Sequence, residues 1–330
     1  MTSVRPRQDP LPATPPSGPE PSRPRPAEPT TLARDGEPPA APVLDDDCWF
    51  LSGPTAAGKS DLALALSRRL DAEIVSVDSM AVYRGLDVGT AKPTPAQRAA
   101  IPHHALDLVD PVAEFSVAQW LAAAARAVAD CRGRGRRILF VGGTPLYLRA
   151  LRDGLAPLPG ADAGVRARLL AEAAAVGNGP LHARLAAVDP VAAARIHPHD
   201  LKRIVRGLEV AETTGRPLSA AFAPAPHPVF DRQLLVVDLP RQELRRRIDE
   251  RVERMFAGGI VEETAAALAR PGGIGPTARQ AAGYAEVIEF LAGGIDRDAA
   301  IRRTQSRTRQ LAKRQLTWLR SFPAAVWLAC

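Results

Sequence analysis

Residues 50–63, FLSGPTAAGKSDLA, constrain the fold of this chain more than any other segment. An apolar stretch that predicts a strand precedes the segment, and a leucine-spaced stretch that predicts a helix follows it. In that context a glycine-rich loop presents backbone N–H groups and the N-terminus of a helix to phosphate oxygens. We therefore predict a phosphate-binding loop made of Gly53, Pro54, Thr55, Ala56, Ala57, Gly58, Lys59 and Ser60. Lys59 adds a positive charge, and the hydroxyl of Ser60 can ligate Mg²⁺.

The segments around this loop predict a parallel sheet. Four apolar stretches without alternation are typical of buried strands, at residues 48–52, 73–78, 136–143 and 233–240. Helical patterns separate them, and Ser116 can cap a helix that runs to about Cys131. Strands that alternate with helices favour the α/β class, here with a P-loop NTPase-like parallel sheet as the core.

Composition divides the chain into four parts. Residues 1–45 are rich in proline and poor in large apolar side chains, so we expect a disordered tail. Residues 46–154 form the first part of the α/β core, and residues 155–225 predict a helical insertion without a strand. Residues 226–330 complete the core and continue as basic helices to about Phe322. Pro240 suits a helix start, and Gly258 a stop.

Asp78 is the acidic residue that matters most in this pattern. P-loop ATPases and GTPases usually hold magnesium with an acid at the end of a later strand, yet here the strand 136–143 runs into Gly142-Gly143-Thr144. Asp78 instead ends the stretch EIVSVD, and ligands of open α/β sheets bind at the carboxyl ends of strands. Asp78 is therefore either a general base, a magnesium ligand or a turn cap. Residues 78–93 are polar and contain glycines, which predicts an active-site loop in which Thr90 and Lys92 could contact phosphate.

The charge distribution suggests a polyanionic partner. The formal net charge is +7, which a general bias toward arginine could also explain. From Ala299 to the C-terminus there is no acidic residue. The basic residues of that stretch are Arg302, Arg303, Arg307, Arg309, Lys313, Arg314 and Arg320. Like charges on one helix repel one another, so we expect nucleic acid to bind there.

Other classes of function find little support. The three cysteines lie far apart, and neither His103-His104 nor His197 and His199 have Cys or carboxylate partners at ligand spacing. We therefore predict no histidine metal site. No apolar run approaches the ~20 residues of a membrane span, and the N-terminus lacks a signal-peptide pattern. These features fit a cytoplasmic enzyme.

The chain resembles the tRNA dimethylallyltransferases, also called tRNA isopentenyltransferases. Six stretches in family order carry the resemblance, and they cover nearly everything from Cys48 onward. They are GPTAAGKS (53–60), SVDSMAVYRGLDVGTAKP (76–93), VGGTPLYLRAL (141–151), DPVAAARIHPHDLKRIVRGLEV (189–210), QAAGYAEV (280–287) and RQLAKRQLTWLR (309–320).

The resemblance implies a reaction and a set of catalytic residues. Such enzymes transfer a dimethylallyl group from dimethylallyl diphosphate to N6 of the adenine 3′ of the anticodon, in tRNAs that read codons starting with U. The loop would then hold a diphosphate that leaves whole, with Mg²⁺ on Ser60. Asp78 matches the family's general base, Thr144 a residue near the reacting amine, and Arg251 an arginine that stabilises the leaving group.

The resemblance also implies contacts to the tRNA anticodon stem-loop. They carry over to Asp78, Ser79, Met80, Ala81, Thr144, Arg166, Lys202, Arg203, Arg206, Gln280, Gly283 and Tyr284. Three residues depart from the common family pattern, namely Ala81, Pro145 and Ala285. These departures bear on contacts to the base and leave Lys59, Asp78 and Thr144 intact.

Three alternatives stay open at this point. A small-molecule P-loop kinase shares the loop and the core, but it does not explain the basic C-terminal stretch. An adenylate isopentenyltransferase acting on free nucleotide needs neither the insertion nor that stretch. A non-catalytic tRNA-binding protein would not need Lys59, Asp78 and Thr144. One active site is complete within one chain, so we expect a monomer.

Overall fold

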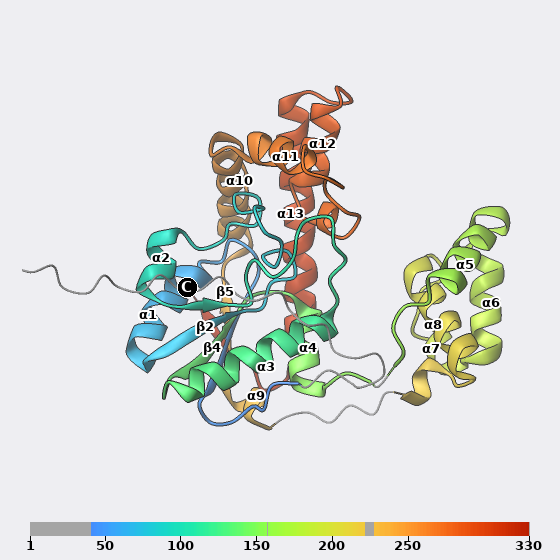
Figure 1. Ribbon diagram of the computed structural model, residues 1–330, viewed down its shortest axis with the longest axis horizontal. Helices are drawn as coiled ribbons and strands as arrows, with labels where there is room; N and C mark the ends of the chain where they lie inside the picture. The colour runs from blue at the N-terminus through green and yellow to red at the C-terminus, as the bar shows by residue number, and fades with distance from the viewer. Residues whose placement is uncertain (1–40, 157, 222–227, 330) are drawn as a thin grey trace, which may run out of the picture. The chain divides into compact units, whose positions relative to one another are not determined.

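The computed structural model describes residues 41–156, 158–221 and 228–329 (Figure 1). Most of the predicted tail lies outside these ranges. Within them the folded part begins earlier than predicted, because Leu44 is buried in the core of the sheet.

A six-stranded sheet forms the centre of the described chain. Its strands are β1 (Cys48–Ser52), β2 (Ala72–Ser76), β3 (His103–His104), β4 (Arg137–Val141), β5 (Leu234–Asp238) and β6 (Val326–Ala329). The strand order is β3-β2-β4-β1-β5-β6, and every strand pair is parallel. The predicted parallel α/β core is confirmed. The prediction omitted the two edge strands, β3 and β6, which are only two and four residues long.

Helices between the strands cover the two faces of the sheet. They are α1 (Lys59–Leu70), α2 (Pro95–Ala100), α3 (Val117–Gly133), α4 (Pro145–Asp153) and α9 (Pro228–Gln233). The side chain of Ser116 accepts a hydrogen bond from the N–H of Gln119 and closes a capping box, so α3 begins where the sequence predicts. Phe50 and Phe140 pack on one face with Trp120, whereas their neighbours Leu51 and Leu139 pack on the other. This alternation shows that both faces of the sheet are buried.

The segment between α4 and α9 is helical and has its own core. It contains α5 (Ala163–Val176), α6 (Asn178–Val188), α7 (Pro190–Ala193), α8 (Leu201–Thr214) and a short 3₁₀ helix (Leu218–Ala221). Leu169, Leu181, Leu185 and Ile204 are fully buried against one another. The side chain of Asp189 caps α7 and also accepts hydrogen bonds from Ser219, which ties the end of the segment to its middle.

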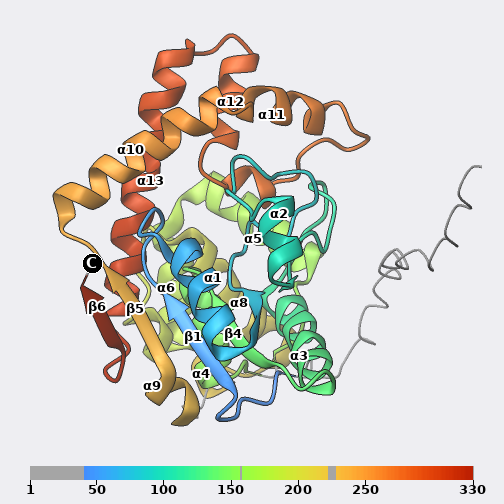
Figure 2. The same cartoon turned by 90° about the vertical axis from the view of Figure 1, so that its left-hand side faces the viewer.

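Four helices follow β5 and lead to the last strand. They are α10 (Arg241–Ala257), α11 (Ile260–Leu268), α12 (Tyr284–Leu291) and α13 (Arg297–Leu319), with a 3₁₀ turn at Ala278–Gln280. As predicted, α10 begins after Pro240 and ends before Gly258. Both views place α10, α11 and α12 together beyond one end of the sheet, while α13 runs back toward the strands (Figures 1 and 2). No helix in the described ranges is long and apolar enough to span a membrane.

The strand order brings three predicted motifs together at the carboxyl ends of the strands. The phosphate loop follows β1, Thr144 lies just past β4, and Asp78 lies two residues past β2. Because β4 lies between β1 and β2, and the strands are parallel, these three segments leave the sheet side by side.

Candidate active site

The phosphate loop takes the conformation that its sequence predicts. It joins β1 directly to α1, whose N-cap is Gly58 with a left-handed φ of 90°. The ammonium of Lys59 donates to the carbonyl oxygen of Pro54 at 2.7 Å, across the mouth of the loop. Ser60 is exposed in the first turn of α1, and its hydroxyl makes no hydrogen bond with the described residues. The N-terminus of α1 and these two side chains together suit an anion with a bound cation.

Lys59, Arg251 and Asp78 lie close enough beside this loop to influence one another electrostatically. Burial lowers the pKa of Lys59 to about 8, with a smaller contribution from the positive charge of Arg251 and an opposing one from Asp78. Burial likewise lowers the pKa of Arg251, against the attraction of Asp78. The cations repel each other and Asp78 offsets only part of their charge. A bound dianion would relieve this repulsion, so the site favours a phosphorylated ligand.

Asp78 caps a turn, which is one of the three alternatives that the sequence left open. One carboxylate oxygen, Oδ1, accepts hydrogen bonds from the N–H groups of Met80 at 2.8 Å and Ala81 at 3.3 Å, as a turn cap does. The other, Oδ2, makes no hydrogen bond within the part of the chain that the structure describes. The carboxylate is therefore held in place by one oxygen, which leaves Oδ2 able to accept a proton or bind a cation.

Thr144 is fixed to the same segment as Asp78. Its hydroxyl accepts a hydrogen bond from the N–H of Ser79 at 3.0 Å, and its own N–H donates to the carbonyl of Val77 at 3.2 Å. A Cβ on the neighbouring Gly142 would lie 2.2 Å from that carbonyl oxygen, so only glycine allows this approach. Pro145 occupies the first helical position of α4, where proline is well tolerated.

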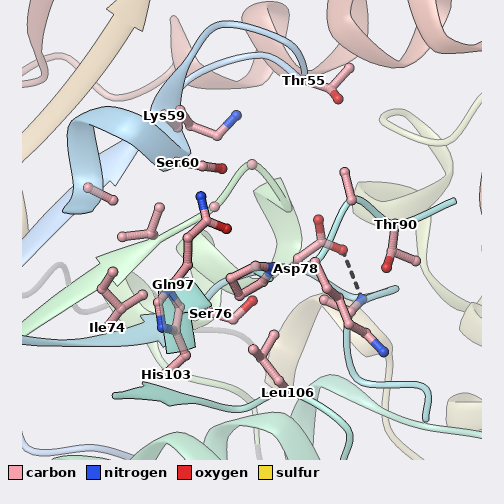
Figure 3. A pocket seen from close by; sticks show the side chains of 18 of the residues that line it. Thr55, Lys59, Ser60, Ile74, Ser76, Asp78, Thr90, Gln97, His103 and Leu106 are labelled. Carbon is pink, nitrogen blue, oxygen red and sulfur yellow. Dashed lines mark hydrogen bonds between the residues drawn. The ribbon is translucent and has the colours of Figure 1, made fainter. Parts of the chain in front are cut away.

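One pocket collects most of these residues (Figure 3). Thr55, Lys59, Ser60, Asp78 and Arg251 line it, and so do Ala81, Thr90 and Gly143. The pocket is also lined by the apolar side chains of Ala63, Leu64, Ile74, Leu106 and Val141, and Ser76, Gln97 and His103 lie among them. A pocket lined by cations, a carboxylate and several apolar side chains suits a ligand that has both an anionic and an apolar part.

Lys92, which the sequence left as a possible phosphate contact, is paired with carboxylates in this structure. Its side chain is only 1% exposed, and its ammonium donates to Asp87 at 2.7 Å and to Asp107 at 2.6 Å. These ion pairs hold the 78–93 loop, which lines the pocket with Thr90 and Lys92.

The basic residues predicted to contact tRNA differ in their exposure and partners. Arg166 and Arg206 both form ion pairs at 2.9 Å with Glu209, which is fully buried, while Lys202 and Arg203 are exposed on α8. Gln280 is exposed in the 3₁₀ turn before α12.

Tyr284 and Gly283, which are also among the predicted tRNA contacts, are buried in this structure. The side chain of Tyr284 is 0% exposed, and its hydroxyl donates to Glu263 at 2.6 Å. Tyr284 packs against Gly89.

The prediction of uncompensated charge along the C-terminal helix was also wrong in part. Acidic residues of other helices neutralise three of its arginines: Glu289 pairs with Arg303, Glu286 with Arg307, and Asp249 with Arg309. The acid-free stretch therefore has partners that are distant in sequence. Its exposed basic residues without an ion pair in the described part of the chain are Arg302, Lys313, Arg314 and Arg320.

Sequence reasoning missed a cluster around His104. Glu73, His104 and Cys131 place their ligand atoms within 4.8 Å of one another. The guanidinium of Arg134 binds both oxygens of Glu73, at 2.7 and 3.0 Å, and lowers its pKa to about 2. Burial raises the pKa of the Cys131 thiol to about 12. The three side chains are linked by hydrogen bonds, since Nε2 of His104 lies 2.6 Å from Oε2 of Glu73 and the Cys131 thiol donates to the same oxygen at 3.4 Å.

Sequence reasoning also missed Gln315, which lines the pocket from α13. Its side-chain amide binds both the phosphate loop and the turn that precedes Thr144. The signal in the sequence was its spacing from Ala312 and Leu319, which puts a polar side chain on the buried face of a helix.

Family profiles match most of the chain. One described as IPP transferase matches residues 81–322, and one described as Isopentenyl transferase matches residues 47–103. A tRNA dimethylallyltransferase of Anaeromyxobacter dehalogenans is 52% identical over 281 residues, which cover 85% of this chain and 94% of the relative. Another, of Geobacter metallireducens, is 47% identical over 284 residues, which cover 84% of this chain and 91% of the relative.

Solved structures agree with these similarities. The tRNA isopentenylpyrophosphate transferase of Bacillus halodurans superimposes with a TM-score of 0.63 at 34% identity, covering 86% of this chain and 90% of that one. A eukaryotic dimethylallyltransferase acting on tRNA gives a TM-score of 0.69 at 25% identity, over 85% of this chain and 73% of that one. The profile over residues 81–322 and the near-full-length relatives confirm the resemblance drawn from the motifs, and the chain belongs to the tRNA dimethylallyltransferase family of prenyltransferases.

Proposed function

We propose that this chain transfers the dimethylallyl group of dimethylallyl diphosphate to N6 of adenine 37, next to the anticodon, in tRNAs that read codons starting with U. The observation that carries the proposal is that Lys59, Arg251 and Asp78 line one pocket together with apolar side chains. The names of the relatives point to the same reaction.

The cationic side of the pocket suits the leaving group. When the allylic C1–O bond breaks, its electron pair goes to the diphosphate and positive charge develops on C1. Lys59, Arg251 and the N–H groups of the phosphate loop are fixed before the reaction, so they stabilise the departing anion without reorganisation. In our proposal the apolar side chains of the same pocket, such as Ile74 and Leu106, pack against the allylic chain.

Asp78, on the acidic side of the pocket, suits the adenine amine that accepts the dimethylallyl group. The lone pair of the adenine amine is delocalised into the ring, so the amine attacks well only if a base takes its proton as the N6–C1 bond forms. The oxygen Oδ2 of Asp78 takes that proton in our proposal, and the hydroxyl of Thr144 orients the amine. Adenine 37 must leave its stack to enter the pocket, which costs a few kcal/mol.

Magnesium fits the loop. Mg²⁺ prefers oxygen ligands and retains several waters, and the exposed Ser60 hydroxyl has no protein partner among the described residues. We propose that Ser60 holds the ion together with oxygens of the diphosphate. The bound ion would neutralise charge that develops on the leaving group.

The remaining expectations follow from the substrate. We propose that Ser79, Met80, Ala81, Lys202, Arg203 and Gln280 contact the anticodon stem-loop, and that the enzyme works as a monomer in the cytoplasm. Arg166 and Arg206 would contribute to RNA binding through helices α5 and α8, which their ion pairs with Glu209 hold together.

A transfer assay tests the function. The protein is mixed with Mg²⁺, radiolabelled dimethylallyl diphosphate and unmodified tRNA carrying adenines at positions 36 to 38. Asp78→Asn keeps an oxygen that can accept the N–H bonds of Met80 and Ala81 but removes the base. We expect transfer to fall about 10²–10⁴-fold, while pyrophosphate still binds. Asp130→Asn, an exposed change on α3, is the control and keeps full activity.

The alternatives give different results in the same assay. Label in AMP but not in tRNA would identify an enzyme of free nucleotides. ATP turnover without label in either acceptor would identify a kinase. Binding of tRNA without any turnover would leave only a binding protein.

A further inference from the structure

The side chain of Gln315 connects three parts of the active site. It lies on the buried face of α13 and is only 7% exposed. Its Oε1 accepts a hydrogen bond from the N–H of Thr55 in the phosphate loop, at 2.8 Å. Its Nε2 donates to the carbonyl oxygen of Gly143, also at 2.8 Å. Both ends of one amide are therefore used, and they point to segments that precede Gln315 by 260 and 172 residues.

The surroundings leave this amide one orientation. A Cβ on Gly143 would lie 2.6 Å from Nε2 of Gln315 and 2.9 Å from the carbonyl oxygen of Gly53. The glycine thus lets the turn after β4 approach both the loop and the glutamine. Reversing the amide would set its N–H₂ against the N–H of Thr55 and its oxygen against the carbonyl of Gly143.

The two bonded segments belong to opposite sides of the reaction. Thr55 is in the loop that binds the leaving group. Gly143 precedes Thr144, whose hydroxyl is bonded to Ser79 beside Asp78. Gln315 therefore links the loop that would bind the diphosphate to the turn before Thr144, whose side chain would contact the adenine amine.

We propose that Gln315 is a positioning residue that fixes the phosphate loop relative to Thr144 and Asp78, so that the allylic carbon and N6 meet in line. The inference rests on the proposed function. Glutamine is suited to the task because it offers a donor and an acceptor at the end of a flexible side chain of the required length. A displacement of about 1 Å between reacting groups can lower the rate about 10²-fold.

Gln315→Met tests the proposal, because methionine has a similar length and shape but makes neither hydrogen bond. Gln242→Met is the matched control, since Gln242 is exposed at the start of α10 and makes no hydrogen bond with the described residues. Three quantities are measured with each protein: kcat for transfer, the Kd of magnesium pyrophosphate, and the fraction of dimethylallyl diphosphate that is hydrolysed instead of transferred to tRNA.

We expect Gln315→Met to lower kcat at least about tenfold and to raise the hydrolysed fraction, while the Kd of pyrophosphate changes by less than kcat. A merely structural role would lower the amount of active protein and leave the hydrolysed fraction unchanged. Unchanged kcat and partition would overturn the proposal, and so would a loss confined to pyrophosphate affinity. Failure of the wild-type protein to prenylate tRNA would instead refute the proposed function.

Gly143→Ala provides a second approach if Gln315→Met does not fold. The methyl group of the new alanine would lie too close to Nε2 of Gln315 and would displace it. The backbone of Gly143 is not left-handed, so alanine can adopt its conformation. We expect the same rise in hydrolysis. An unchanged hydrolysed fraction in Gly143→Ala would contradict the proposal.

Discussion

Lys59 shows at the scale of one residue how the pocket is set to receive an anion. Its amine has a pKa of about 8, well below its usual 10.5, because it is buried beside Arg251. A bound diphosphate raises that pKa again. Above about pH 8 the amine is largely neutral in the free enzyme and must take up a proton on binding. Diphosphate affinity should therefore fall as the pH rises through 8, by up to about tenfold per pH unit.

The Kd of pyrophosphate between about pH 7.5 and 9.5, at fixed free Mg²⁺, measures this effect, and calorimetry in buffers of different ionisation enthalpy counts the protons. Lys59→Arg is the informative variant, because a guanidinium stays charged throughout this range. Its affinity should lose most of the pH dependence. If the arginine variant kept the same slope, the titrating group would not be Lys59.

The sequence predicted the positions of individual residues in the fold where a motif or a strand end located them. The phosphate loop, Asp78 and Thr144 lie at adjacent strand ends, as their positions after apolar stretches required. Gln315 could not be found that way, because its partners lie in loops that only the tertiary fold brings to α13. Helical spacing alone would have shown a buried glutamine, without identifying Thr55 or Gly143 as its partners.

The 78–93 loop is held in place by helix α11. Glu263 of α11 accepts hydrogen bonds from the N–H groups of Asp87 at 2.6 Å, Val88 at 2.8 Å and Gly89 at 3.2 Å. The hydroxyl of Tyr284 donates to the same carboxylate. Three consecutive backbone amides around one anion form a specific anchor for a loop that begins at Asp78 and reaches the pocket at Thr90.

Glu263→Gln should loosen this anchor, because an amide has one acceptor oxygen and its N–H₂ would face a backbone N–H. Leaving such a group unpaired costs about 1–3 kcal/mol, which thermal or denaturant unfolding would measure. We expect kcat/KM for transfer to fall about tenfold as the loop moves. Glu262→Gln, an exposed change on the same helix, should alter neither quantity. Equal behaviour of the two variants would mean that the loop needs no anchor.

Elements were predictable when they were long and strongly patterned. The four central strands and the capped helix α3 appeared where the sequence indicated. The edge strands β3 and β6 were missed because they are only two and four residues long. The burial of Tyr284 was missed because a motif match identifies a position but not the direction of its side chain.

The basic residues of α13 contribute to the positive charge of the molecule, but they differ in whether they are ion-paired. Arg303, Arg307 and Arg309 are ion-paired with acids of α10 and α12, so they fasten helices together. Arg302, Lys313 and Arg314 are exposed and have no such partner among the described residues. Only the second set offers free cations to a polyanion, although both sets contribute equally to the net charge of +7.

Neutralising the two sets separately distinguishes binding from packing. Replacing Arg302, Lys313 and Arg314 by glutamine should weaken binding of all tRNAs and reduce the dependence of log K on log salt, by about 0.7–0.9 for each phosphate that the protein no longer neutralises. Replacing Arg303, Arg307 and Arg309 should mainly lower the unfolding temperature. Anisotropy titrations of labelled tRNA between about 50 and about 200 mM salt measure the slopes. If the first triple variant kept the wild-type slope, α13 would not contact tRNA phosphates. The exposed Lys202 and Arg203 of α8 would then be the next charges to neutralise.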